Sequence, residues 1–287
     1  MGLNSLQLIE PTLAPFPGTA TTAVITSFQV GRQPSTISVR RVATLDELNL
    51  ATPGEPVQRT SLSAHARWTI LSRPTVERRA DFVELGEYCR VHRGQATGAN
   101  KIWIVNGESG LPPGVLFSTV TRARELLEAG LELSDCARLK HVIDIPPNFE
   151  EFTPEERSVI EHFLLQARAL GADQGYIAQH RRPWWAVNLR DPAPILATYM
   201  ARRSPVFVRN LARARHINVA HGLYPLEPMS DGVLMALARF LSESATVDQG
   251  RTYAGGLTKF EPGEMERILV PRLELLAHYV RHGELVR

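Results

Sequence analysis

The residues with the clearest chemical potential are arginines interleaved with aromatic side chains in residues 176–224. This stretch holds eight arginines and a single acid, Asp191. The planar guanidinium fork binds phosphate groups and guanine edges, and an aromatic ring can stack on an exposed base. The pattern therefore predicts nucleic-acid binding. The predicted contacts in this stretch are Arg181, Arg182, Trp184, Trp185, Arg202, Arg203, Asn210, Arg213, Arg215 and Asn218.

The segregation of charge along the chain supports this interpretation. Residues 125–161 hold ten acids and three bases, although the whole chain has a net charge of only +2. Arginine supplies 29 of the 32 basic residues. Codon bias in a GC-rich genome explains an excess of arginine but not its segregation, so a basic segment indicates a polyanionic partner. The alternative is a core of aromatic residues beside a solvated arginine face, and for each aromatic residue singly core packing is favoured.

Two glycine-containing segments are further candidates for contact with a partner. Residues 93–100 read RGQATGAN, and two glycines with an asparagine permit left-handed backbone and close approach. Residues 253–264 read YAGGLTKFEPGE and form a candidate phosphate-contacting loop. For both segments the alternative is turn chemistry alone. The predicted contacts are Arg93, Gln95, Thr97, Asn100, Lys101, Tyr253 and Lys259.

Motifs for a self-contained active site are missing from the sequence. There is no Gly-x-Gly, no Walker A sequence, no His-Glu-x-x-His and no Gly-x-Ser-x-Gly. Cys89 and Cys136 are too few and too far apart to predict a disulfide framework or a zinc site. We therefore predict no catalytic residue, no metal ligand and no cofactor bound by this chain.

Length and composition are those of a globular protein. The 287 residues are 44% hydrophobic and 22% charged, which suits one large domain or two modest ones. No apolar run reaches the roughly 18 residues of a membrane-spanning helix, and residues 1–15 do not resemble a secretory signal. We expect a cytoplasmic protein with no membrane partner.

The elements that must position these residues fall into two groups. Residues 19–30 and 36–42 predict two strands of a β-hairpin, residues 51–80 predict a linker, and a mixed α/β unit follows. The clearest helix follows Thr153, because Thr153 and Glu156 have capping-box spacing and Gly171 ends the apolar periodicity. Further helices are predicted at 121–129, 231–241 and 273–281, and strands at 101–105, 184–189, 195–200, 205–209 and 215–220.

In this order, several segments resemble the target-recognition region of TaqI-like, adenine-specific DNA methyltransferases of restriction-modification systems. The resemblance lies in LGEYCRVHRGQATGANKIWIV, VTRARELLEAG, the stretch from RRPWWAV to HGLYP, and RTYAGGLTKFEPGEMERILVP. TATTAVITSF, at residues 19–28, resembles the last strands of that family's catalytic domain. The resemblance implies an α+β fold with three parts. These are a β-hairpin tail of a Rossmann-like domain (1–50), a linker (51–80) and a target-recognition domain (81–287).

In that family, the Rossmann-like domain binds S-adenosylmethionine and an Asn-Pro-Pro-Tyr motif holds the flipped adenine, because chemistry on a base requires its removal from the stack. This chain departs from the pattern, since neither of its Pro-Pro pairs, Pro112-Pro113 and Pro146-Pro147, matches. The resemblance thus implies a double-stranded DNA partner, inactivity alone, and a separate catalytic chain that supplies the cofactor. The free edge of the hairpin is the predicted docking site for that chain.

Three alternatives stay open at this point. The chain is a non-enzymatic DNA-specificity subunit that serves a nuclease or another effector, an inactive gene fragment, or a part of a phosphoesterase or RNA-modifying enzyme. In the last case RNA would bind better than duplex DNA.

Overall fold

The computed structural model describes residues 2–10, 13, 16, 23–49, 52–64, 80–107, 109–253 and 257–282. Its contacts divide the chain into two compact units. The first comprises residues 1–79 with 251–259, and the second comprises residues 80–250 with 260–287. Half of the predicted linker, residues 65–79, lies outside the described residues, and residues 55–58 and 60–64 in its other half form a strand and a short helix.

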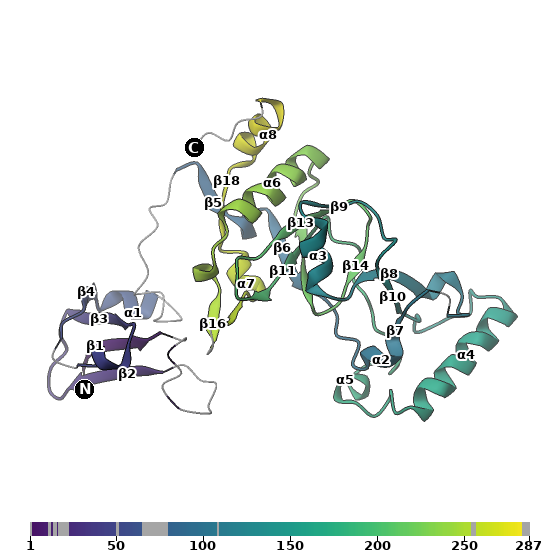
Figure 1. The fold of residues 1–287 in the computed structure, drawn as a ribbon, viewed down its shortest axis with the longest axis horizontal. Coiled ribbons are helices and arrows are strands. Elements are labelled where there is room, and N and C mark those ends of the chain that lie inside the picture. The colour runs from purple at the N-terminus through teal and green to yellow at the C-terminus, as the bar shows by residue number, and fades with distance from the viewer. Residues whose placement is uncertain are drawn as a thin grey trace. The chain divides into compact units, whose positions relative to one another are not determined.

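A four-stranded sheet with the order β2-β1-β3-β4 forms the first unit (purple in Figure 1). The strands are β1 (Gly2–Ile9), β2 (Val24–Gln29), β3 (Thr36–Val42) and β4 (Glu55–Gln58). A 3-10 turn, η2 (Leu45–Glu47), and a short helix, α1 (Thr60–Ala64), complete it. Leu6 and Ile37 are almost fully buried between strands, and Leu62 of α1 packs against their cluster. The hairpin β16 (Arg251–Tyr253) and β17 (Leu257–Lys259) is antiparallel.

The predicted β-hairpin is wrong. β2 and β3 are strands, but β1 lies between them and pairs antiparallel with β2 and parallel with β3. Residues 19–22 of the predicted first strand lie outside the described residues. Periodicity located the two strands but carries no information about their partners. β1 escaped prediction because it is buried on both faces, Leu6 on one and Gln7 on the other, and so does not alternate between apolar and polar residues.

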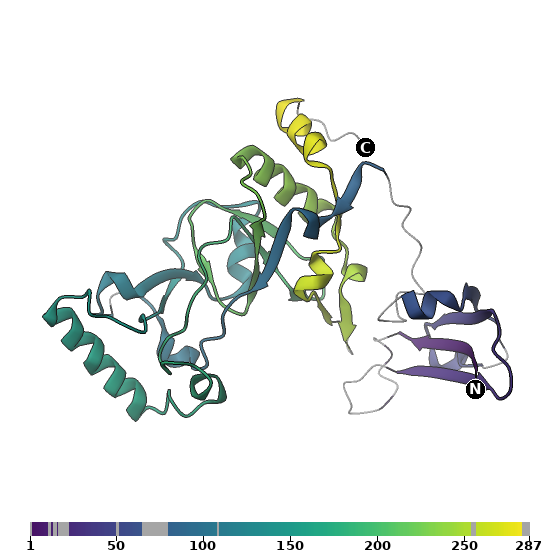
Figure 2. The same ribbon diagram turned by 180° about the vertical axis from the view of Figure 1, so that it is seen from behind.

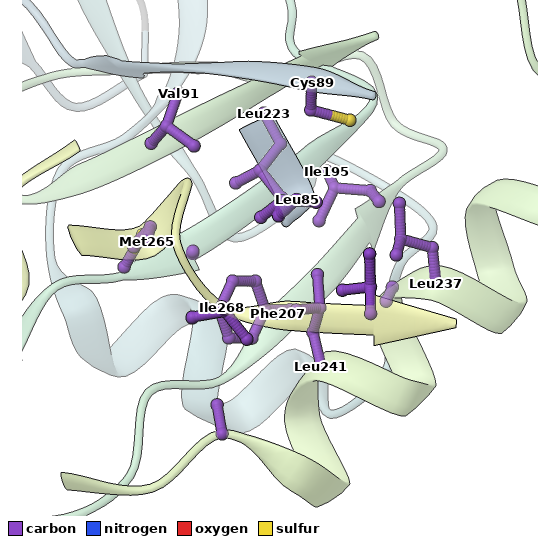
Figure 3. Packing of buried hydrophobic residues seen from close by; sticks show 14 of the residues in the cluster. Leu85, Cys89, Val91, Ile195, Phe207, Leu223, Leu237, Leu241, Met265 and Ile268 are labelled. Carbon is purple, nitrogen blue, oxygen red and sulfur yellow. The ribbon is translucent and has the colours of Figure 1, made fainter. Parts of the chain in front are cut away.

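The main sheet of the second unit has the order β6-β15-β11-β13-β9. It comprises β6 (Cys89–Arg93), β9 (Glu132–Leu133), β11 (Ile195–Thr198), β13 (Phe207–Asn210) and β15 (Ala220–Pro225). Figure 3 shows its core, where Cys89, Ile195, Phe207 and Leu223 meet Leu237 of helix α6 (Asp231–Ser244). Helix α8 (Leu273–His282) packs beside α6 in both views of Figures 1 and 2. The remaining elements here are β5 (Phe82–Glu84), η4 (Leu85–Glu87), β12 (Met200–Ala201), η6 (Val247–Gln249), α7 (Pro262–Met265) and β18 (Leu269–Pro271).

A second sheet of this unit has the order β14-β8-β10-β7. Its strands are β7 (Ile104–Val105), β8 (Leu116–Val120), β10 (Lys140–Ile143) and β14 (Arg215–His216). Around it lie α2 (Asn100–Trp103), η5 (Pro113–Val115), α3 (Ala123–Ala129), α4 (Pro154–Ala169) and α5 (Tyr176–Gln179). A second core cluster includes Trp103, Val142 and Ile160. In both views α4 lies at the end of this unit opposite to α8.

The predicted helices are confirmed. At α4 the Thr153 hydroxyl accepts a hydrogen bond from the Glu156 N–H at 3.2 Å, and the Glu156 carboxylate accepts one from the Thr153 N–H at 3.0 Å. Gly171 follows the helix with a φ of +79°, a left-handed conformation that favours glycine. Helix α3 begins at Ala123, two residues after the predicted start, and at α6 the Ser230 hydroxyl accepts from the Val233 N–H at 3.4 Å.

Two predicted strands are wrong. Residues 101–105 begin as the helix α2 and only their last two residues are a strand, β7. Residues 184–189 contain no strand or helix. Short apolar runs do not distinguish a strand from a buried turn of helix or loop, and here the tertiary packing of Trp103 and Val187 accounts for the apolar residues. The runs 195–200, 205–209 and 215–220 do contain β11, β13 and β14. Among the described residues no helix is long and apolar enough to cross a membrane.

Candidate nucleic-acid interface

The loop formed by residues 94–100 joins β6 to α2 and is held against the segment between β14 and β15. The Gly94 N–H donates to the Ala220 carbonyl at 3.1 Å, and the Asn218 N–H donates to the Gln95 carbonyl at 3.0 Å. A Cβ atom at position 94 would lie 2.0 Å from the Ile217 carbonyl oxygen. Glycine is therefore required there, because two backbones approach more closely than a side chain permits.

Arg181 also holds this loop, through hydrogen bonds to its backbone. Its guanidinium donates to the Thr97 carbonyl at 3.1 Å and to the Ala96 carbonyl. The Thr97 hydroxyl is itself buried and donates to the side-chain oxygen of Asn100. Burial lowers the pKa of Arg181, and the nearby Asp144 carboxylate partly opposes that shift. The side chains of Thr97 and Arg181 thus stabilise the loop through hydrogen bonds within the chain.

Two further arginines of the basic stretch are also committed internally. Arg209 is 8% exposed, donates to the Pro194 carbonyl at 2.7 Å and pairs with Asp231 at 2.5 Å. Arg215 donates to the carbonyls of Leu189 and Arg190 at 2.8 and 2.9 Å. The guanidinium of Arg215 also lies 4.3 Å from the centre of the Phe117 ring. The geometry of Arg215 fits a structural role better than the predicted DNA contact.

Four other arginines of the stretch face solvent. Their side chains make no hydrogen bond or ion pair within the part of the chain that the structure describes. Three of them, Arg182, Arg203 and Arg213, were among the predicted contacts, and Arg202, which was also predicted, is exposed as well. The scarcity of acids in residues 176–224 therefore corresponds to arginine charges at the surface that no acid neutralises among the described residues. The four are Arg182, Arg190, Arg203 and Arg213.

The tryptophans and Asn210 do not fit the roles that the sequence suggested. Trp184 and Trp185 belong to the second core cluster, and the Trp185 indole donates to the Pro146 carbonyl at 3.3 Å. Asn210 is 3% exposed, and its amide donates to the carbonyls of Ala193 and Ala214 and accepts from the Ala214 N–H. A buried amide with three backbone partners has no group to offer to a base edge.

Strand pairing brings Arg93 close to Asn218. Arg93 is opposite His221 in the β6–β15 register, and its guanidinium lies 5.7 Å from the centre of the Tyr199 ring. The Tyr199 hydroxyl donates to the Asn218 carbonyl at 2.9 Å, and the Tyr199 ring stacks on His221 at 4.5 Å. The exposed Arg93, Asn100 and Lys101 therefore mark the outer side of this loop region, together with the half-buried Gln95 and Asn218.

The two remaining predicted contacts are Tyr253 and Lys259. They lie on β16 and β17, which belong to the first unit. Tyr253 is 43% exposed. Residues 254–256, the centre of the predicted phosphate-contacting loop, lie outside the described residues.

The sequence analysis overlooked a histidine cluster beside the loop, and it left Arg190 out of the predicted contacts. His216 is 1% exposed, and neither ring nitrogen has a hydrogen-bond partner among the described residues. Burial, followed by repulsion from His221, lowers the pKa of His216 to about 4. Arg190 contributes to that shift and to the lowered pKa of His92, so its charge lies near both rings. The nine scattered histidines gave no signal, because His92, His216 and His221 lie on three different strands, β6, β14 and β15, and come together only in the fold.

Within the described residues no group of histidine, cysteine or acidic side chains could hold a metal ion.

The model of the C-terminal domain of the Type II methyltransferase M.Eco57I matches residues 69–286. The Type II methyltransferase M.XamI of Xanthomonas campestris pv. amaranthicola is 50% identical over 96% of this chain and 53% of its own length. M.AccI of Acinetobacter calcoaceticus, also a Type II methyltransferase, is 23% identical over 68% of this chain and 38% of its own length.

Among solved structures, the type IIG restriction endonuclease BpuSI aligns with 98% of this chain and 39% of its own chain, at 12% identity and a TM-score of 0.47. The chain thus spans about half the length, or less, of the curated relatives that it matches. The family model covers well over half of the chain, and the chain therefore belongs to the family of the C-terminal domain of the Type II methyltransferase M.Eco57I.

Proposed function

We propose that this chain is the DNA target-recognition part of an adenine-specific methyltransferase of a restriction-modification system. Membership of a Type II methyltransferase C-terminal family supports a role on DNA. The adenine preference rests on the resemblance of the motifs between residues 85 and 271 to the TaqI-like group. We propose further that catalysis and S-adenosylmethionine belong to a separate catalytic half.

The observation that carries the proposal is the set of unneutralised arginines. Arg182, Arg190, Arg203 and Arg213 face solvent with no carboxylate partner in the described parts of the chain. An exposed charge without an internal partner is free to release counterions from a DNA backbone. Such contacts position a protein on the duplex without reading its sequence. The base sequence would then be recognised by the loop region, where Asn100 and Lys101 are exposed.

We propose no methyl-donor site at the hollow of about 390 Å³ beside Arg215. The Asp144 carboxylate on its wall already accepts the N–H groups of Asn188 and Leu189 at 2.9 and 2.7 Å. Asp191, on the same wall, is turned to solvent with 92% of its side chain exposed. No step of the reaction is therefore assigned to this hollow.

Binding to labelled duplex DNA across a salt series tests the proposal. The logarithm of the affinity falls with the logarithm of salt concentration with a slope of about −0.9 for each phosphate neutralised. We expect a slope of several units for the natural chain, and a slope smaller in magnitude by about 3.6 units when all four exposed arginines are replaced by alanine. Flat or absent binding by the natural chain would overturn the proposal.

Arg124→Ala is the matched control for the arginine variants. Arg124 is exposed like the four arginines, but it lies on α3 and pairs with Glu128 at 2.6 Å. Its replacement should leave both affinity and slope unchanged. An equal loss in this variant would mean that any surface charge contributes, and that the basic stretch has no special part in binding. Competition with duplex RNA separates the remaining alternative, because an RNA-modifying partner would favour RNA.

A further inference from the structure

We propose that Arg181 is a positioning residue, which fixes the 94–100 loop in the shape that presents Asn100 and Lys101, and that it does not itself bind phosphate. Only the last step, presentation to DNA, rests on the proposed function. The neighbouring Arg182, which the sequence does not distinguish from it, is assigned the opposite role of a phosphate contact.

The two hydrogen bonds of Arg181 carry this inference. The guanidinium reaches across 84 and 85 residues of chain to two consecutive carbonyls, those of Thr97 and Ala96. Neither carbonyl has another donor among the described residues. Both bonds are part-buried, so removal of the donor would leave two acceptors unsatisfied away from water. A forked, planar group suits this task, because two N–H groups of fixed geometry meet two fixed oxygens.

The loop is short enough for this clamp to determine its outer face. On one side of the clamp, Gln95 is fixed by the Asn218 N–H. On the other side, the Thr97 hydroxyl donates to the Asn100 side-chain oxygen, and the N–H of the buried Trp103 bonds to the Ala99 carbonyl. With its oxygen occupied, Asn100 keeps its two amide hydrogens for outside acceptors. The clamp therefore acts on DNA recognition through Asn100 and Lys101, both of which are exposed.

Lysine substitutions separate the two roles, since lysine keeps the charge and loses the fork. If Arg181 bound phosphate, Arg181→Lys would bind DNA nearly as well as the natural chain. If Arg181 positions the loop, Arg181→Lys resembles Arg181→Ala. Arg182→Lys is the matched control at the adjacent position, where the side chain is exposed and makes no bond within the described residues.

Hydrogen exchange on the DNA-free full chain tests the clamp independently of the proposed function. We expect backbone amides of residues 94–103 to exchange at least several-fold faster in Arg181→Lys than in the natural chain, because their opening no longer breaks the clamp. Arg182→Lys should exchange like the natural chain. Unchanged exchange in Arg181→Lys would overturn the inference, as would equal acceleration in both variants.

Selection from a library of duplexes with a randomised centre tests the consequence for recognition. Arg181→Lys should lose sequence preference by roughly tenfold, and Arg181→Ala should do so with an unchanged salt slope. Arg182→Ala should keep its preference and lose about 0.9 from the slope. A smaller slope in Arg181→Ala, or full preference in Arg181→Lys, would contradict the positioning role. If the natural chain binds no DNA, the proposed function fails while the exchange experiment still decides the role of Arg181.

Discussion

At the scale of single residues, burial assigns different roles to side chains that the sequence alone does not distinguish. Asn210 and Asn218 lie eight positions apart and were predicted to play the same part. Asn210 is buried and bonds three backbone groups, whereas the side chain of Asn218 makes no such bond among the described residues. The chemistry of a side chain is known from its type, but its partner is set by the fold around it.

The two asparagines give a direct prediction. Asn210→Ala removes three hydrogen bonds to buried backbone groups, which we expect to lower the free energy of unfolding by about 3 kcal/mol. Asn218→Ala should change it by less than about 0.5 kcal/mol, as is usual for a side chain away from such networks. Urea unfolding followed by circular dichroism measures both. Equal losses would show that Asn210 is not the structural member of the pair.

His216 makes stability depend on pH. Its pKa falls from 6.5 to about 4 in the folded chain, first through burial and then through the nearby His221, Arg190 and His92. The unfolded chain binds a proton below pH 6.5 and the folded chain does not until about pH 4. The stability present above pH 6.5 is therefore lost as the pH falls toward 4, by roughly 3 kcal/mol in total.

Urea unfolding at pH 7.5 and at pH 5 checks this dependence. His216→Gln should reduce the difference between the two pH values, although the lowered pKa values of His92 and His221 leave a part of it. His162→Gln is the control, because His162 is exposed on α4 and bonds only to Gln166 nearby. A difference that survives unchanged in His216→Gln would rule out His216 as its source.

At the scale of elements, the α4 helix was predictable because its signals are local. A threonine cap, a proline at the first position, a glutamate at the third and a glycine after the end all lie within one segment. The strand β1 and the helix α2 were not predictable, since their form depends on partners far away in the sequence. The sheet neighbours of β1 are β2 and β3, and Trp103 of α2 packs against Phe163 and Trp184.

The cap of α4 is testable on its own. Thr153→Ala leaves the Glu156 N–H without its acceptor, which we expect to lower the free energy of unfolding by about 1 kcal/mol. Ser158→Ala, on the exposed face of the same helix, should raise it slightly, by about 0.5 kcal/mol at most, because alanine is the better helix former. Urea unfolding distinguishes the two signs. A lower free energy of unfolding in both variants would mean that the helix tolerates neither change and that the cap makes no special contribution to stability.

At the scale of the whole molecule, the chain spans about half the length of M.XamI. We expect the purified chain to transfer no methyl group from labelled S-adenosylmethionine to DNA, because the proposed function places the reacting groups on a separate half. Supplying the part of M.XamI that this chain does not match, as a second polypeptide, should give transfer. Turnover by the chain alone in a clean preparation would refute this division of labour.

The identity of the partner separates this proposal from its rival at the same scale. A methyltransferase-like chain that co-purifies from the native host would support it. A nuclease in that place would support the alternative of a non-enzymatic specificity subunit. With either partner, we expect the four exposed arginines to contact DNA. The salt series and the co-purification therefore test different statements.

The sequence by itself determined the segregation of charge, the capped helices, the positions of β11, β13 and β14 in the second unit and the resemblance to a DNA methyltransferase family. These features depend on residue type and on short spacing, which the chain carries in linear form. Only the tertiary structure decided which arginines remain free for a partner. Arg181, Arg209 and Arg215 donate to backbone carbonyls, while Arg182, Arg190, Arg203 and Arg213 have no such acceptor among the described residues. The physical reason is that a buried carbonyl must find a donor, and folding determines which arginine is within reach.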